Sequence, residues 1–369
     1  MLKGLDLQSL AAKIVANQGQ KKDMIASTDT LEVQLQAPEP VLNEKTGEYV
    51  VDAKAKQLPV LYVPDHGQFP IQPVAHDQIG SHLQIPAKYY DRMLAEQPGL
   101  LAANVNTWFR QQRAKPEKRM IRALRGNARA FLSNRYQRIE NEEIAEVALP
   151  VLYDIPGVQI PSAEVTDRRL YIHFTLPSIQ GEVKRGDVVQ AGGLITNSEI
   201  GFGSVSVSVL LWRLVCLNGL KTQDVFRRNH VGRKLESDSD LDWADDTRQA
   251  DDRAILLKVR DMVKAAADEG RFQENLRRLQ GLTEGEITGK IDKAVEVLAQ
   301  KLNVTESEQN SILTSLAKGG DLSRWGIVNA VTAQAHEAQS YDRAVEFEAL
   351  GGHLANLPKD DWKAILEAA

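Results

Sequence analysis

The sequence has only one cysteine, Cys216, and no uninterrupted apolar run of the roughly 18 to 20 residues that a membrane-spanning helix needs. One cysteine can form no disulfide within the chain, and it excludes zinc and iron–sulfur sites built from several cysteines. The opening segment Met1–Lys22 carries Asp6 and several polar residues where a signal peptide would be apolar. We therefore expect a protein of the reducing cytoplasm, without a membrane segment.

Proline is absent from residues 178–357, although the chain contains fourteen prolines. The proline-containing part ends in two stretches that alternate with the period of a strand, Arg169–Leu176 and Ser204–Val209. Turn-forming clusters at 184–187, 192–193 and 197–203 separate them, which predicts an antiparallel β-meander over roughly 168–216. In the second stretch we expect valines to point inward and serines to form an exposed face suited to assembly.

After residue 236 the hydrophobic period becomes 3.6, as in Ile255, Val259 and Met262, which is typical of helices. We therefore predict an α+β fold: an antiparallel β-meander with packed helices, followed by an α-helical C-terminal domain. Residues 236–252 carry eight acids against one arginine, which favours a solvated linker or the acidic start of a helix. The predicted units are a segment of helix plus strand or loop (1–55), an α+β core (56–235), the acidic linker (236–252) and the helical domain (253–369).

Negative charge is nearly absent from residues 109–138, which contain ten lysines and arginines and one acid, Glu117. The net charge of this stretch is +9, whereas the whole chain carries −5, so the remainder sums to −14. Exposed helix faces often carry such charges, but local acids are too few here to neutralise them by i,i+4 pairing. Arginine outnumbers lysine, which favours bidentate contacts to phosphate.

Aromatic residues interrupt the cationic stretch and provide flat surfaces on which bases could stack, each worth on the order of 1 to 3 kcal/mol. A second basic cluster follows at 226–234, and the two together predict a groove for a nucleic-acid backbone. For Tyr136 a core role, with its hydroxyl bonded to the backbone, is an equal alternative. The predicted site residues are Arg119, Arg122, Arg125, Arg129, Phe131, Arg135, Tyr136, Arg138, Arg227, Arg228, Arg233 and Lys234.

Motifs for catalysis or cofactor binding are missing. The sequence has no GxxxxGK[ST] loop and no GxSxG elbow, and the GFG at 201–203 lacks the strand-turn-helix setting of a dinucleotide site. His66, His76, Asp77 and His82 suggest a metal-dependent phosphohydrolase, but no later motif completes that set. We expect no metal, no cofactor and no enzymatic activity.

Residues 79–93 have the spacing of a helix-turn-helix, in which Lys88 and Arg92 would face a duplex. Short helix pairs with this spacing are also common as packing units. The pattern therefore favours ordinary packing.

Three stretches carry a resemblance to a known family. They are Arg129–Leu152 with its LSxRYxxIxN run, residues 186–219 with an NSE turn and an RxVCxNG strand end, and residues 226–233. Together they resemble the phage- and plasmid-borne proteins gathered as domain of unknown function 932, over roughly residues 60–235. The N-terminal segment up to about residue 55 and the region after 236 lie outside that resemblance.

The resemblance implies a protein of mobile elements whose α+β core is distantly similar to single-strand annealing proteins of the Rad52 type, which assemble into rings or filaments. We therefore expect a cytoplasmic protein that binds single-stranded DNA and assists annealing or protection as a homo-oligomer. Its C-terminal helices could contact a protein partner. The alternative is an anti-defence or regulatory protein whose acidic 236–252 segment imitates nucleic acid, and a nuclease is a third possibility.

Overall fold

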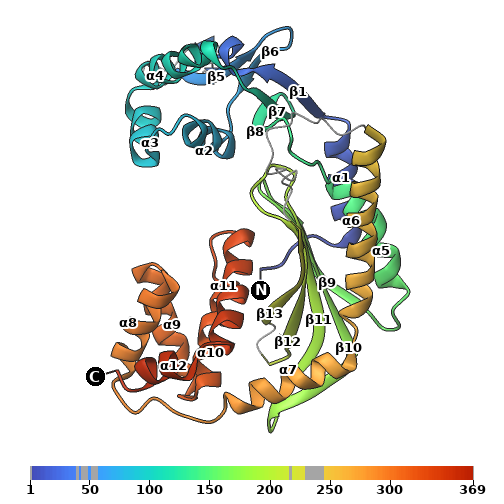
Figure 1. Cartoon of the computed structure of the whole chain (residues 1–369). Helices are drawn as coiled ribbons and strands as arrows, with labels where there is room; N and C mark the ends of the chain where they lie inside the picture. The colour runs from blue at the N-terminus through green and yellow to red at the C-terminus, as the bar shows by residue number, and fades with distance from the viewer. Residues whose placement is uncertain are drawn as a thin grey trace.

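The computed structural model describes residues 2–38, 41–42, 49–50, 57–215, 218–228 and 245–368. The chain is C-shaped, with an N-terminal module at one end, a long twisted sheet in the middle and a group of C-terminal helices at the other end (Figure 1). The α+β fold, the antiparallel meander and the helical C-terminal part are confirmed. Within the described ranges, no helix is both long and apolar enough to cross a membrane.

The N-terminal module contains two three-stranded antiparallel sheets and three helices around a core that includes Phe109, Phe131 and Ile79. One sheet has the order β1-β7-β8 (Lys21–Ser27, Lys118–Leu124, Asn127–Ser133), and the other has the order β2-β5-β6 (Glu32–Gln36, Leu58–Val63, Gly67–Pro70). The helices are α2 (Pro73–His82), α3 (Ala87–Glu96) and α4 (Pro98–Gln111), with short helices η1 (Thr28–Thr30) and η2 (Gln112–Ala114). Strands β3 (Val41–Leu42) and β4 (Tyr49–Val50) form a separate pair.

The central sheet has the order β13-β12-β11-β10-β9, so every strand pairs with its neighbour in sequence. Its strands are β9 (Gln159–Val165), β10 (Leu170–Lys184), β11 (Asp187–Asn197), β12 (Val205–Arg213) and β13 (Asn218–Arg228). Ile172, Ile195 and Val207 are cross-strand neighbours on one face, which is the apolar face that the alternating pattern predicts. This face packs against α1 (Leu7–Gln18), α5 (Asn141–Tyr153) and α6 (Asp245–Ala265) (Figure 1).

The opposite face of the central sheet is also buried, so the expected exposed serine face is wrong. Ser206 and Ser208 are 4% and 0% exposed, and Ser206 exchanges a 2.8 Å hydrogen bond with Thr196. Helix α11 (Tyr341–Ala355) covers this side of the sheet. Its side chains form hydrogen bonds with Tyr171 and His173 of β10. A serine hydroxyl can form a hydrogen bond with a side chain on the neighbouring strand. Serine can therefore lie beneath a helix without leaving a buried polar group unpaired.

The remaining C-terminal helices continue from the sheet. They are α7 (Glu269–Gly281), α8 (Ile291–Leu302), α9 (Glu306–Gly319), α10 (Arg324–Thr332), η3 (Ala333–His336) and α12 (Lys359–Leu366). Helix α7 packs on β10 at Gly181, where a Cβ atom would lie 2.4 Å from Leu276. Residues 245–252 of the acidic segment are the first turns of α6, and Asp251 and Asp252 accept hydrogen bonds from Gln137.

Candidate nucleic-acid interface

The β7–β8 hairpin carries four of the ten predicted cationic site residues, and it is a strand pair rather than a helix. Its turn is formed by Arg125 and Gly126, which both have positive φ angles of 51° and 77°. Two successive residues with positive φ match the right-handed twist of the strands they connect. In the register of β7 with β1, Arg122 lies directly opposite Asp23, so one of its counter-charges comes from a strand 99 positions earlier.

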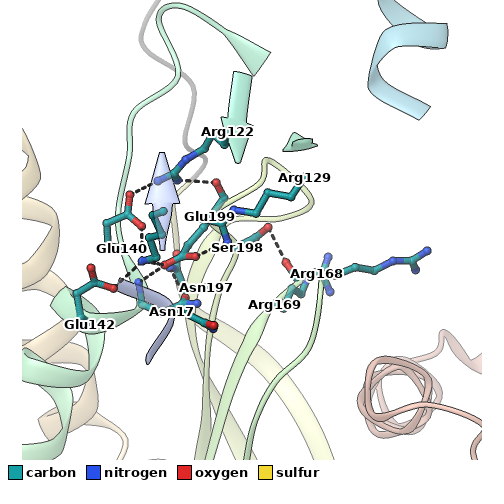
Figure 2. Close-up of polar contacts among 12 residues, drawn as sticks. Asn17, Arg122, Arg129, Glu140, Glu142, Arg168, Arg169, Asn197, Ser198 and Glu199 are labelled. Atoms are coloured by element: carbon teal, nitrogen blue, oxygen red, sulfur yellow. Dashed lines mark hydrogen bonds and ion pairs between the residues drawn. The ribbon is translucent and has the colours of Figure 1, made fainter. Parts of the chain in front are cut away.

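Arg122 is 1% exposed and lies in a cluster of buried charges between the hairpin and the central sheet (Figure 2). Its Nε donates to Asp23 at 2.8 Å, its Nη1 donates to the backbone carbonyl of Glu199 at 2.7 Å, and its Nη2 donates to Glu140. Burial disfavours the charged guanidinium, but the carboxylates of Glu140 and Asp23 outweigh it and raise the pKa of Arg122.

Glu199 is the centre of this cluster. Its carboxylate accepts from Arg129 at 2.8 Å, from Lys21 at 2.7 Å and from the backbone N–H of Asn141 at 2.9 Å. Burial would raise the pKa of Glu199, but the charges of Arg129 and Lys21 hold it at about 2. Burial raises the pKa of the neighbouring Glu140, although the positive charge of Arg122 acts to lower it. The cluster joins the β1-β7-β8 sheet to the central sheet.

The assignment of Arg122, Arg129 and Phe131 to a nucleic-acid surface is therefore wrong. Arg129 is 7% exposed and its Nη1 is bonded to Glu199, while Phe131 is 1% exposed and packs against Phe109 in the core. Buried guanidinium groups that are paired with the protein's own carboxylates cannot reach a phosphate.

Tyr136 has the core role that the sequence left as an alternative. Its hydroxyl donates to the carbonyl of Ser198 at 2.8 Å and accepts from the N–H of Gly201 at 3.1 Å. Burial raises the pKa of this phenol. The side chain thereby fixes the β11–β12 turn to the segment after β8.

Three predicted arginines do remain exposed: Arg125, Arg135 and Arg138. Arg125 donates to Asn17 at 3.0 Å, and Arg138 lies 3.2 Å from Asp23. Of the second basic cluster, Arg227 and Arg228 belong to β13 but their side chains lie outside the described residues, as do Arg233 and Lys234 entirely.

Arg119 differs from the buried arginines because it borders open space. It lines a pocket of about 500 Å³ between α2, the open end of the hairpin and the β11–β12 turn. Its guanidinium lies over the Phe131 ring at 4.9 Å, and the nearest carboxylate is Glu117, at 3.8 Å. The exposed Arg113, Lys115 and Lys118 lie on the segment that leads into β7, and among the described residues none of them has an ion-pair partner.

A second group of residues at this pocket was missed by the sequence analysis. Phe202, 37% exposed on the β11–β12 turn, lies beneath Arg168 at 4.5 Å and Arg169 at 5.4 Å. Arg169 also donates to the carbonyl of Phe202 at 2.7 Å, and Arg168 extends away from the buried cluster (Figure 2). The available signal was an aromatic residue between two glycines in a turn, which is an unusual place for a core side chain.

Metal-binding chemistry finds little support in the described part of the chain. Its one group of three close carboxylates is Glu140, Glu142 and Glu199, and the ammonium of Lys21 lies 2.7–2.8 Å from an oxygen of each. The histidines considered earlier do not form such a group with other described ligands. His76 is instead buried and bonded to Tyr90 at 2.8 Å.

Comparison with known proteins gives one match. No curated protein and no solved structure matches this sequence. A family model described as domain of unknown function (DUF932) matches residues 129–349. The match begins later than the resemblance indicated and continues through most of the C-terminal helices, which we had placed outside it. Because it covers more than half of the chain, the protein belongs to the DUF932 family.

Proposed function

We propose that this protein binds single-stranded DNA on the surface around the Arg119 pocket and assists annealing or protection of the strand. The observation that carries this proposal is the set of exposed cations at the start of β7 and just before it, Arg113, Lys115 and Lys118, none of which forms an ion pair within the described residues although Glu117 lies among them in sequence. Arg168 lies over the ring of the pocket residue Phe202, at 4.5 Å, and adds a further positive charge beside the pocket. Successive phosphates of a single DNA strand would contact these cations.

The proposed role is binding without catalysis. A nuclease would need carboxylates available to a metal ion, whereas the one close carboxylate group in the described part of the chain is already paired with Lys21, Arg122 and Arg129. Likeness to the Rad52-type annealing proteins and assembly into a homo-oligomer belong to the same proposal, and they rest on the family resemblance alone. Such proteins need a positive groove and a stacking surface but no cofactor.

The test is a titration of fluorescein-labelled 30-mer oligonucleotides, single- and double-stranded, at 50 and 200 mM salt. We expect the single strand to bind more tightly, with a log–log salt slope of about −0.7 for each phosphate contact. The triple variant Arg113→Ala/Lys115→Ala/Lys118→Ala should lose at least tenfold in affinity and about two units of slope. A matched control is Arg185→Ala/Lys318→Ala/Lys363→Ala, because it also removes one arginine and two lysines that are exposed and lie outside this surface.

Two results would contradict the proposal. One is the absence of any binding by the parent protein at 50 mM salt, which would favour the alternative of a protein-binding regulatory factor. The other is an equal loss of affinity in the triple variant and in the control, which would mean that net charge alone determines binding.

A further inference from the structure

Among the predicted site residues that the structure describes, Arg119 combines a position at a cavity with a guanidinium that has no hydrogen-bonded carboxylate. Its side chain is 17% exposed, and its buried Nε has no hydrogen-bond acceptor among the described residues. Glu117 lies 3.8 Å from Nη1, too far for a hydrogen bond, and is itself 59% exposed. Because Nε is itself inaccessible, an acceptor that enters the pocket would meet the terminal Nη groups, which form no hydrogen bond with the described residues.

Phe202 lines the same pocket from the β11–β12 turn, whose backbone forms hydrogen bonds with neighbouring side chains. Gly201 has a φ of 72°, and its N–H is bonded to Tyr136, while the N–H of Phe202 donates to Ser198 at 3.0 Å. Arg168 and Arg169 lie over the Phe202 ring and cover part of it, and the side chain that lines the pocket remains 37% exposed. A partly exposed aromatic ring is a surface on which a base can stack.

The charges that line the pocket limit the ligand. Arg119 contributes one positive charge and Asp77 contributes one negative charge. Burial, followed by the charge of Arg119, lowers the pKa of His82, so its imidazole is neutral at pH 7. One cation can neutralise a singly charged phosphodiester but not the several charges of a nucleoside triphosphate. The volume of about 500 Å³ is within the range of about 300–1,000 Å³ that is usual for small-ligand sites.

We propose that this pocket holds one unstacked nucleotide of a single strand, with a phosphodiester on the Arg119 guanidinium and the base against Phe202. This inference rests on the proposed function and adds a defined site to it. A base in the pocket must leave its stack, so a duplex is a poor ligand. The surface cations Arg113, Lys115 and Lys118 would hold the flanking phosphates.

The experiment compares two pocket variants of the full-length protein, Arg119→Gln and Phe202→Ala, by anisotropy of a labelled single-stranded 30-mer. We expect each to lose about tenfold in affinity. Only Arg119→Gln should reduce the salt slope, by about 0.7, because it alone removes a phosphate contact. Phe202→Trp should retain affinity. Matched controls are Arg185→Gln and Tyr153→Ala, since Arg185 is an exposed arginine and Tyr153 an aromatic residue that is 65% exposed.

The outcomes separate the two proposals. If the parent binds the strand and both pocket variants bind within twofold of it, the pocket inference is overturned while the proposed function stands. If the parent binds no oligonucleotide, both fail. Competition provides a second readout that does not depend on folding of the variants. A short unlabelled single strand should compete at least tenfold better than ATP or a duplex, and preferential competition by ATP would overturn the assignment to a phosphodiester.

Discussion

The buried charge cluster makes a quantitative prediction for the substitution Glu199→Gln. This change keeps the shape of the side chain but removes the negative charge that Arg129 and Lys21 share. Arg129 has no other carboxylate partner among the described residues, and its Nε and Nη2 are buried without a hydrogen bond. Breaking a buried ion pair by removing one partner typically costs about 3–5 kcal/mol, so we expect a loss of that size.

The measurement is equilibrium unfolding in urea, followed by tryptophan fluorescence and by circular dichroism. The double variant Glu199→Gln/Arg129→Met should be no less stable than Glu199→Gln alone, because it removes the unpaired guanidinium as well. Glu182→Gln, an exposed carboxylate on β10, serves as the control and should change stability by less than about 0.5 kcal/mol. A cost below about 1 kcal/mol for Glu199→Gln, or simple additivity in the double variant, would refute the account of the cluster as a desolvated ion pair.

The same cluster should make the stability of the folded protein depend on pH. The pKa of Glu199 is about 2 in the folded protein and near 4.5 when unfolded, so its contribution is complete above about pH 4.5 and is lost as the pH falls toward 2. In Glu199→Gln this part of the acid sensitivity should disappear. An unchanged acid unfolding profile would show that Glu199 is not held ionised by its neighbours.

Three further predictions concern other buried features. Burial lowers the pKa of His76 to about 4, so stability should fall as the pH decreases from 6.5 to 4, and urea midpoints of His76→Gln should lack that decline. Gly201→Ala should cost more than Gly157→Ala, because both glycines have φ near 70° but only at Gly201 would the new Cβ meet a side chain, Leu132 at 2.6 Å; urea unfolding measures the difference. Tyr341→Phe should cost about 1–3 kcal/mol in the same assay, because its hydroxyl contacts a buried serine at 2.7 Å and a buried histidine at 3.0 Å.

The sheet could be predicted from the sequence because alternation is a local property. The period of two in Arg169–Leu176 and Ser204–Val209 correctly indicated strands, and the predicted turns at 184–187 and 197–203 are confirmed. The predicted turn at 192–193 is wrong, because both glycines lie within β11, where a Cβ atom on Gly193 would lie 2.4 Å from the Phe174 ring. What lies on the second face could not be predicted in this way. Helix α11, which covers it, comes from a distant part of the chain, and serines at strand positions have the same pattern whether water or a helix faces them.

The arginines were misplaced for a related reason. The absence of acids near them in sequence was correctly observed, but the neutralising carboxylates come from distant segments. Asp23 lies 99 positions before Arg122, and Glu199 lies 70 positions after Arg129. Counting i,i+4 partners tests a helix surface, whereas these residues lie in strands whose neighbours are set by sheet pairing.

The motifs that indicated the family therefore explain the architecture better than the activity. Asn141 and Glu199, which belong to two separate motifs, meet in the buried cluster, where a backbone N–H of one bonds to the carboxylate of the other. Such residues hold the hairpin against the central sheet, and any protein that folds this way needs them regardless of its ligand.

The candidate pocket, by contrast, is divided by the boundary of the family match. Phe202 and Gly201 lie within residues 129–349, while Arg119, His82 and Asp77 precede them. The aromatic wall thus belongs to the matched region, and Arg119, the proposed phosphate contact, comes from the preceding N-terminal module. If the pocket holds a nucleotide, a protein with the same matched region but a different module before it would keep an aromatic wall and lose the phosphate contact. Ligand choice would then be determined by the module that precedes the matched region, which makes Arg119→Gln a more decisive test of function than any substitution within the family motifs.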